Sequence, residues 1–335
     1  MERKWWQDKV AYQIYPKSFY DSNNDGIGDI PGIIQKLDYL KDLGVDIIWI
    51  SPCYPSPFAD QGYDISDYYD INPAFGTLED MDHLLAEAKK RDMYIILDLV
   101  VNHCSDEHEW FKKACEDPDG KYGNFFYIED RKEGELPCNW RSYFGGPVWE
   151  PLPGHPDKQY MHVFHKKQPD LNWDNPKVRE EVFSMMNWWC EKGIDGFRMD
   201  VISMISKVEG LPDGKVQGGL YGDASPYVQN GPHVHEYLQE MNKEVLSKYD
   251  LLTVGECAGV TIEEAKKYAS NKGTELGMVF QFEHMDLDQG EFSKWSDKKV
   301  KLTALKENLT KWQNELEGKA WNSLFWCNHD QPRVV

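Results

Sequence analysis

The chain has 335 residues, of which 41% are hydrophobic, and its 57 acidic residues outnumber 37 Lys and Arg to give a formal net charge of −20. This charge argues against nucleic acid and anionic membranes as partners, because both bind basic surface. The simplest explanation of the excess of acidic residues is that the negative net charge keeps the protein soluble.

The cysteines and the N-terminus indicate where in the cell the protein is located. Seven cysteines are scattered without a C-x-x-C pair, which indicates a reduced intracellular protein rather than a disulfide scaffold. The residues that begin at Met1 show no apolar stretch of the kind that a signal peptide needs. No apolar run approaches the roughly 20 residues that span a bilayer. We therefore expect a cytoplasmic protein, and we expect it to be a monomer.

The first predicted strand covers residues 10–15, and a loop rich in oxygen-bearing side chains follows it. Gly26 permits a sharp turn in this loop, and its candidate ligand side chains are Asp21, Asn23, Asp25 and Asp29. Several hard oxygens in one short loop suit Ca²⁺ or Mg²⁺. The loop therefore predicts one structural cation site, with a solvated turn of Asp and Asn residues as the alternative.

Helices and apolar strands then alternate along the chain. The pattern predicts helices at 31–43 and 78–91, with strands at 45–50 and 93–101. Near-continuous apolar strands between helices are typical of a parallel sheet that is buried on both faces. From residue 104 to 173 this alternation stops in a stretch rich in Gly, Pro, Asp, Trp and Phe, which we interpret as a small irregular subdomain inserted after the third strand.

The alternation resumes after the insertion, and we expect strands at 194–199, 251–254, 278–282 and 321–326, and helices at 177–192, 233–249, 262–269 and 302–316. Seven strand-helix units predict an α/β fold, a (β/α)₈ TIM barrel that lacks its eighth unit. Residues 1–103 and 174–335 would form this barrel, with 104–173 as the inserted subdomain. Because a seven-strand barrel has unpaired edges, we expect the chain to be part of a longer one.

Polar residues gather where the predicted strands end. They are Asp98, Asn102, His103, Arg198, Asp200, Glu256, His329 and Asp330. In a barrel the carboxyl ends of all strands meet at one mouth, where barrel enzymes keep their chemistry. Arg198 and Asp200 alone could be a structural ion pair, but the carboxylates of Asp200, Glu256 and Asp330 converging with two His and one Arg favour a catalytic site.

Two carboxyl groups are the minimum for glycoside cleavage, one ionised and one protonated. Their environments must separate their pKa values. Arg198 is expected to lower the pKa of Asp200 and keep it ionised as the nucleophile. Glu256 follows an apolar strand and is assigned as the acid/base. Asp330 would stabilise the positive charge of the transition state.

Four stretches in this order resemble the conserved motifs of the α-amylase family of glycoside hydrolases. They are Asp98-Leu-Val-Val-Asn-His103, Gly196-Phe-Arg-Met-Asp200, Val254-Gly-Glu256 and Asn328-His-Asp330. Gln168-Pro-Asp-Leu-Asn-Trp173 is similar to the marker of the oligo-1,6-glucosidase branch. The resemblance runs from Trp5 to Val335, although members of the family continue to an eighth strand and a C-terminal β-sandwich domain.

The resemblance implies a retaining α-glucosidase in which Asp200 is the nucleophile, Glu256 the acid/base and Asp330 the transition-state stabiliser. It implies that an oligosaccharide's non-reducing glucose is held by Asp60, Tyr63, His103, Arg198 and His329, with Phe144, Phe164 and Gln168 lining the pocket from the subdomain. The cation, Ca²⁺ or Mg²⁺, would bind Asp21, Asn23, Asp25, Asp29 and the Ile27 carbonyl. Val201 follows the nucleophile, and Val at this position goes with α-1,6 preference in this branch.

The leading functional hypothesis is an exo-acting α-1,6-glucosidase for isomalto-oligosaccharides, without an organic cofactor. An α-1,4-glucosidase, a trehalose-6-phosphate hydrolase and a sucrose isomerase or transglucosidase of the same family stay open. A non-catalytic barrel used for binding is a further alternative, but it predicts loss of the carboxylates, and all three are present.

Overall fold

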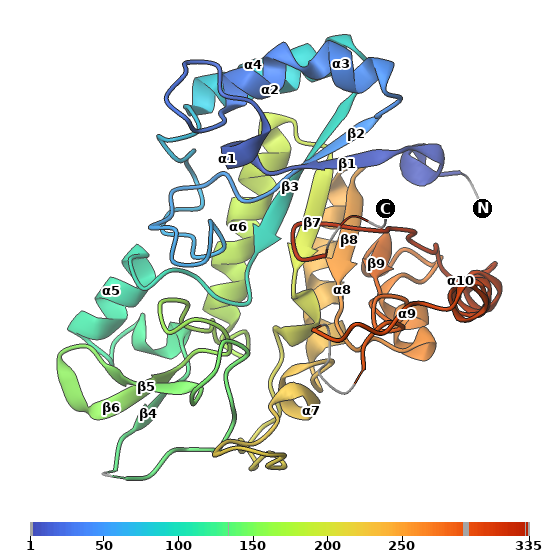
Figure 1. Cartoon of the computed structure of the whole chain (residues 1–335). Coiled ribbons are helices and arrows are strands. Elements are labelled where there is room, and N and C mark those ends of the chain that lie inside the picture. Colours follow the sequence, from blue (N-terminus) through green and yellow to red (C-terminus); the bar gives the residue numbers. More distant parts are fainter. Residues whose placement is uncertain (1–2, 133, 291–294, 332, 334–335) are drawn as a thin grey trace.

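The fold is organised around one parallel sheet, as the computed structural model shows for residues 3–132, 134–290, 295–331 and 333. Six strands pair in the order β1-β2-β3-β7-β8-β9. Their bounds are β1 Ala11–Ile14, β2 Ile47–Ile50, β3 Tyr94–Val100, β7 Gly196–Asp200, β8 Leu252–Glu256 and β9 Met278–Phe280. The sheet curls and the helices lie along its outside, so the fold is most of a (β/α)₈ barrel (Figure 1).

The helices of the barrel alternate with these strands. They are α1 Pro16–Phe19, α2 Ile30–Gln35, α3 Leu37–Asp42, α4 Leu78–Lys90, α6 Pro176–Lys192, α7 Ser225–Val228, α8 Val234–Glu244, α9 Ile262–Tyr268 and α10 Leu302–Leu316. Short 3₁₀ turns add η1 Trp5–Asp8, η3 Ile202–Met204 and η4 Leu246–Lys248. Within the described residues, no helix combines the length and the apolar character that crossing a bilayer requires.

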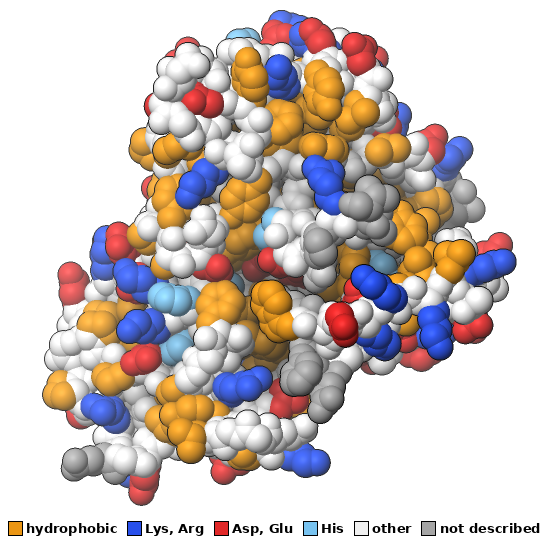
Figure 2. All heavy atoms as spheres, viewed as in Figure 1, with side chains coloured by type: hydrophobic (Ala, Val, Ile, Leu, Met, Phe, Trp, Pro, Cys, Tyr) orange, Lys and Arg blue, Asp and Glu red, His pale blue; other side chains and the backbone are white. Residues whose placement is uncertain are grey.

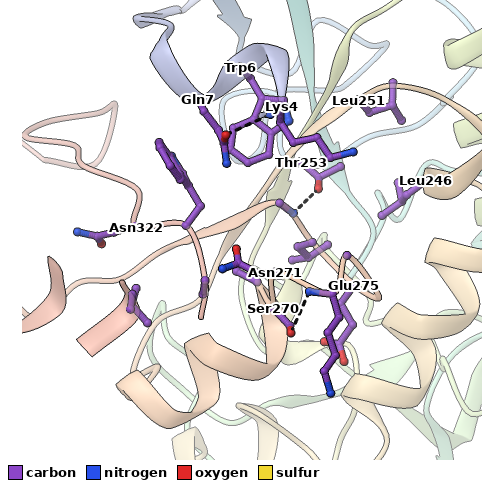
Figure 3. Close-up of a pocket in the computed structure, with 18 of the residues that line it drawn as sticks. Lys4, Trp6, Gln7, Leu246, Leu251, Thr253, Ser270, Asn271, Glu275 and Asn322 are labelled. Atoms are coloured by element: carbon purple, nitrogen blue, oxygen red, sulfur yellow. Dashed lines mark hydrogen bonds between the residues drawn. The ribbon is translucent and has the colours of Figure 1, made fainter. Parts of the chain in front are cut away.

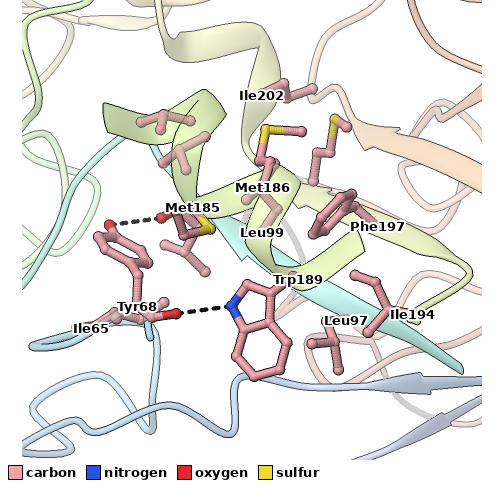
Figure 4. Close-up of a cluster of buried hydrophobic side chains, with 14 of the residues drawn as sticks. Ile65, Tyr68, Leu97, Leu99, Met185, Met186, Trp189, Ile194, Phe197 and Ile202 are labelled. Carbon is pink, nitrogen blue, oxygen red and sulfur yellow. Dashed lines mark hydrogen bonds between the residues drawn. The ribbon is translucent and has the colours of Figure 1, made fainter. Parts of the chain in front are cut away.

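Helix α6 leads into strand β7. Asn175 caps its start by accepting a hydrogen bond from the Lys177 N–H, and Pro176 occupies the first turn. Gly193 ends it in the left-handed conformation (φ 99°), as the sequence predicts. The buried face of α6 packs on β3 and β7, and the Trp189 indole N–H donates to the Tyr68 carbonyl at 2.8 Å (Figure 4). This packing fixes where β7 begins.

Three predicted elements differ from the structure. The helix expected at 233–249 ends at Glu244 and is followed by the 3₁₀ turn Leu246–Lys248. The helix expected at 31–43 is interrupted at Lys36, whose N–H bonds to the Ile33 and Ile34 carbonyls in a tighter turn than an α-helix makes. The strand expected at 321–326 does not form, so that prediction is wrong. Phe325 packs against Phe280 of β9 with ring centroids 4.6 Å apart. The segment makes no strand ladder with β9, and an apolar run without a pairing partner is not a strand.

The inserted region 104–173 is more regular than the sequence suggests. It contains α5 Glu109–Glu116, η2 Gly123–Phe125 and three short strands, β4 Ile128–Asp130, β5 Trp149–Leu152 and β6 His155–Met161. The strands form an antiparallel sheet in the order β4-β6-β5, and Figure 1 shows it beside the carboxyl ends of the barrel strands. Charged residues within β4 and β6 hide the alternation on which strand prediction depends.

The long loop between β7 and α8 packs on this subdomain. Asn139 donates its backbone N–H to Asp213 and exchanges side-chain hydrogen bonds with the backbone of Gly214. Trp140 donates its indole N–H to the Pro212 carbonyl at 2.7 Å. The loop and the subdomain also share a buried apolar cluster that includes Trp140, Trp149, Met204 and Val228. Together they form the wall that faces the barrel mouth.

Candidate active site

Of the cavities lined by described residues, two lie at opposite ends of the barrel, and a third of about 590 Å³ lies beside α6 at Trp188 and Tyr249. The larger of the first two, about 880 Å³, lies near the N-terminal ends of β8 and β9, where Trp6, Thr253 and Glu275 line it (Figure 3). The smaller of them, about 540 Å³, lies at the carboxyl ends and is lined by Tyr15, Ser18, Asp60, Gln61, Tyr63, His103, Phe144, Phe164, Asp200, Val201, Glu256, His329 and Asp330. Because barrel enzymes act at the carboxyl ends of their strands, the cavity at those ends is the candidate active site. Figure 2 shows acidic side chains in the hollow between the barrel and the subdomain.

Strand register brings the charged groups of the pocket floor together. Asp98 on β3 lies opposite Arg198 on β7, and Met199 lies opposite Gly255 on β8. Asp200 and Glu256 are therefore the next residues of two paired strands. Residues two apart on a strand share a face, so Asp98, Arg198, Asp200 and Glu256 meet on one side of the sheet.

The guanidinium of Arg198 lies within ion-pair distance of Asp98, Asp200 and Glu256. Arg198 Nη1 donates to Asp98 Oδ1 and to Asp200 Oδ1, each at 2.8 Å. Arg198 Nη2 lies 2.8 Å from Glu256 Oε2, but the N–H does not point at that oxygen, and Nη2 makes no hydrogen bond. Arg198 is completely buried. Asp98 and Asp200 are therefore hydrogen-bonded to Arg198, whereas Glu256 interacts with it only through the attraction of opposite charges.

Aromatic rings complete the surroundings of the guanidinium. The Arg198 Cζ atom lies 5.0 Å from the centroid of the Trp49 ring and 5.9 Å from that of Tyr63. The Trp49 indole N–H and the Tyr63 hydroxyl each donate to Asp98 Oδ2 at 3.1 Å. Asp98 thus has both oxygens occupied by donors, which makes it a support for Arg198 rather than a group free to react.

Burial dominates the electrostatics of the cluster. It raises the pKa of Asp200 well above its usual range, and the attraction of Arg198 only partly offsets this. Burial also raises the pKa of Asp98. Arg198 lowers the pKa of Asp200, as expected from the sequence, but desolvation outweighs it and the charges of Glu256 and Asp98 oppose it, so the expectation of a lowered net pKa is wrong. Three carboxylates around one cation favour uptake of a proton by the cluster as a whole.

The inner end of the pocket presents polar groups from the barrel and the subdomain. Gln168 donates its amide Nε2–H to Asp60 Oδ2 at 2.9 Å, and the same nitrogen lies 3.1 Å from His103 Nε2. Burial raises the pKa of Asp60 to about 6 and lowers the pKa of His103 to about 4. At neutral pH the pocket therefore presents a carboxylate and an uncharged imidazole, which suit the hydroxyl groups of a sugar.

A stacked His–Tyr pair forms one wall of the pocket. The ring of His329 lies parallel to Tyr63 with centroids 5.1 Å apart. Gln13 on β1 accepts the His329 backbone N–H at 3.1 Å and places its amide nitrogen 2.9 Å from His329 Nδ1. Desolvation lowers the pKa of His329 to about 4. The exposed carboxylate of Asp330 lies at the mouth, 3.6 Å from His329 Nε2.

Three aromatic side chains of the subdomain form the opposite wall and the rim. Phe164 contacts the ring of His103 at 5.3 Å and stacks on Tyr143 at 5.3 Å. Phe144 packs edge-on against Phe164 and is 56% exposed, so it stands at the entrance. Apolar ring faces at a pocket mouth suit the faces of sugar rings.

The pocket gathers nearly every site residue named from the sequence. Gln168 and Arg198 are buried directly behind the lining residues, to which they are hydrogen-bonded. Sequence reasoning missed Tyr15, Ser18 and Gln61 on the lining and Gln13 behind it. Asp98 was seen at its strand end but was given no role; its register with Arg198 supplies one.

The candidate cation loop lies apart from this pocket. Asp21 Oδ1 accepts backbone N–H groups from Asn24 and Asp25, and Oδ2 accepts the Gly26 N–H. Asp29 caps α2 through the Gly32 N–H. In the part of the chain that is described, no three Asp, Glu, His or Cys side chains converge as metal ligands. Asp21 Oδ2 accepts the Gly26 N–H and keeps a second lone pair, so the loop retains an oxygen that can bind a hard cation.

The fold and the pocket define a class of protein. Residues 13–335 match the family described as "Alpha amylase, catalytic domain". The chain belongs to the α-amylase family of glycoside hydrolases.

Several relatives of known name cover the whole chain. It is 58% identical over 335 residues to the oligo-1,6-glucosidase of Bacillus cereus, and 58% identical over 336 residues to that of Parageobacillus thermoglucosidasius. All of this chain matches 60% of each relative, so the chain spans about 60% of their length. Among solved structures, a trehalose-6-phosphate hydrolase of Bacillus licheniformis matches 99% of the chain with a TM-score of 0.93 and 49% identity, over 59% of its own length.

Proposed function

We propose that the protein is a retaining, exo-acting α-glucosidase that hydrolyses α-1,6 bonds at the non-reducing end of isomalto-oligosaccharides. The observation that carries this proposal is the pair Asp200 and Glu256, both 2.8 Å from one buried guanidinium at the floor of the pocket. Similarity to relatives named oligo-1,6-glucosidase and glucan 1,6-alpha-glucosidase supports the substrate class.

The hydrogen bonds of Arg198 support different roles for the two carboxyl groups. Asp200 receives a directed bond from Arg198 Nη1, which stabilises its anion as the nucleophile. Glu256 receives none from Arg198 and is assigned as the acid that protonates the leaving oxygen, then as the base that activates water. Asp330 at the mouth would stabilise the positive charge that develops on the sugar ring.

The remaining residues would hold the terminal glucose. Asp60, His103 and His329 offer hydrogen-bonding groups and Tyr63 offers a ring face, while Arg198 contributes from behind the lining. Phe164 and Phe144 narrow the pocket from the subdomain, and Gln168 fixes Asp60. The inner end of the pocket is occupied by these side chains, which supports attack at the end of a substrate rather than within it.

The test is glucose release by the complete protein from isomaltose, maltose, sucrose and trehalose 6-phosphate. We expect the largest kcat/KM with isomaltose. A preference for trehalose 6-phosphate would instead support the activity named for the Bacillus subtilis relative, which is 48% identical. Conversion of sucrose to an isomer without release of glucose would favour the activity named for the isomaltulose synthase of Klebsiella sp. LX3, whose structure matches with a TM-score of 0.94 and 42% identity.

The side chain of Val201 is the proposed selector of the linkage. It lines the pocket directly after Asp200, and its branched side chain is stiff at χ1. An α-1,6 link has an extra rotatable bond that lets the leaving sugar avoid such an obstruction. Val201→Ala should raise kcat/KM for maltose relative to isomaltose by roughly 10–200-fold, as expected for one or two methyl groups. An unchanged ratio would mean that Val201 only packs on the neighbouring apolar cluster, which it also contacts.

We propose in addition that the loop Asp21 to Asp29 binds Ca²⁺ or Mg²⁺ through Asp21, Asn23, Asp25, Asp29 and the Ile27 carbonyl. Hydrogen bonds from the backbone, that of Gly26 above all, lower the pKa of Asp21 and keep it ionised. A chelator should lower Tm without changing kcat at low temperature, and Asp21→Asn should remove the response to the chelator. A loss of kcat at unchanged Tm would contradict a structural role for this cation.

A further inference from the structure

The backbone at Val201 has an unusual conformation next to the carboxyl groups of the pocket. Val201 has φ 34° and ψ 38°, which is the left-handed region. A β-branched residue is rarely found there, because its Cβ crowds the backbone. Such strain persists only where the surroundings enforce it, and it is frequent at functional sites.

This conformation aims the Val201 N–H at Glu256. The N–H donates to Glu256 Oε2 at 3.0 Å, and it is the one directed hydrogen bond to this carboxyl group from the described residues. Arg198 Nη2 also lies 2.8 Å from Oε2, but its N–H points elsewhere. Both neighbours of Oε2 are donors with no lone pair to offer, and no described residue bonds to Oε1.

The 3₁₀ turn that follows Val201 is held close to β8. The Met204 N–H donates to the Val201 carbonyl at 2.8 Å, which closes the turn. Gly255 precedes Glu256, and a Cβ at Gly255 would lie only 2.8 Å from Ile202 Cγ2 and 2.6 Å from Leu276 Cδ1. The absence of a side chain at 255 therefore allows the turn to approach the strand that carries Glu256.

We propose that the backbone N–H of Val201 positions Glu256 and holds its catalytic proton on Oε1. A backbone N–H can only donate, so Oε2 must act as an acceptor and the acid form carries its hydrogen on Oε1. That hydrogen passes to the leaving oxygen, and Oε1 later accepts a proton from the attacking water. The inference rests on the proposed role of Glu256, and it gives Val201 a backbone function separate from the linkage selection by its side chain.

The test replaces Val201 with its α-hydroxy acid analogue in the complete protein, which exchanges the N–H for an ester oxygen and keeps the side chain. Loss of a donor to the anion favours the protonated form, so the alkaline limb of the kcat/KM profile should move upward by about 1 pH unit. We expect kcat on isomaltose to fall about tenfold while KM changes little, because the N–H contacts Glu256 and not the sugar.

The matched control is the same ester at Met204, which removes one hydrogen bond from the same turn and leaves the Val201 N–H in place. It should leave the alkaline limb unmoved. Val201→Gly supplies an independent arm, since glycine adopts positive φ freely; it should keep the alkaline limb and should not lower Tm. The proposal would be overturned if Val201→Gly shifted the alkaline limb of the kcat/KM profile. It would also be overturned if the ester at 201 left that limb unmoved, as the ester at 204 should. Unmodified protein that releases no glucose would instead refute the proposed function.

Discussion

Replacing Asp200 with Asn in the complete protein should lower kcat on isomaltose by about 10⁴-fold or more, the loss expected when a catalytic nucleophile is removed. The amide has nearly the same shape but cannot form the glucosyl ester. Tm should not fall, because burial already opposes the charge of Asp200. Steady-state kinetics and thermal unfolding of the same preparation measure both quantities.

The control for this change lies at the other end of the same strand. Asp195 is partly buried, and its carboxylate accepts the Ile95 backbone N–H at 2.8 Å, away from the pocket. Asp195→Asn makes the same chemical change and should keep kcat within a few-fold. A small anion such as azide should restore turnover of an activated aryl α-glucoside by Asp200→Ala and give the β-glucosyl azide, because it attacks from the face that Asp200 occupied. Equal losses at Asp195 and Asp200 would contradict a nucleophilic role.

Arg198→Met should cause the largest loss of stability. Arg198 is fully buried and is the shared partner of Asp98, Asp200 and Glu256. Removing one side of a buried ion pair costs about 3–5 kcal/mol, because the other charges stay uncompensated. Arg91→Met is the control: Arg91 also pairs with two carboxylates, Asp38 and Glu87, but at the surface. It should change Tm little.

The loss caused by Arg198→Met should also depend on pH. Even with Arg198 present, the pKa of Asp98 is raised to about 6, and without it the pKa values of the cluster rise further. A carboxyl group with a higher pKa when folded binds more protons in the folded state, so stability falls as pH rises above its unfolded value of about 4. The variant should therefore lose most stability near neutral pH and recover on acidification. A loss that does not change between pH 4 and 7 would show that lost packing, not charge, is responsible.

Sequence reasoning located the strand-end residues because their positions follow from periodicity. Asp200 and Glu256 each follow an apolar stretch, and a barrel brings such ends together. The same reasoning misjudged the net pKa of Asp200, since it considered Arg198, two residues away, but not the burial of Asp200, which is the largest cause of the shift. The register across β3, β7 and β8 adds Asp98 and Glu256 as competitors for that guanidinium. Pairing across strands is not visible in the local pattern.

The elements that were missed also depend on partners distant in sequence. Residues 321–326 are apolar enough for a strand, but a strand forms only where its backbone pairs with a neighbouring strand. The ring of Phe325 packs on Phe280 of β9, which is a side-chain contact and not backbone pairing. Val201 adopts the left-handed backbone conformation, although β-branched residues such as Val favour extended conformations. Only the approach of the turn to Gly255 and the bond to Glu256 reveal it. In both cases tertiary contacts override local preference.

The anomer of the glucose first released from an aryl α-glucoside by the complete protein tests the assignment of the two carboxyl groups most directly. The leaving group is then a phenol, so all glucose comes from the cleaved bond. ¹H NMR during the first minutes, before mutarotation, distinguishes the two anomers. Attack by Asp200 and then by water, with Glu256 as acid and then base, predicts α-glucose as the first product. The appearance of β-glucose first would show a single inverting displacement and would contradict Asp200 as the nucleophile.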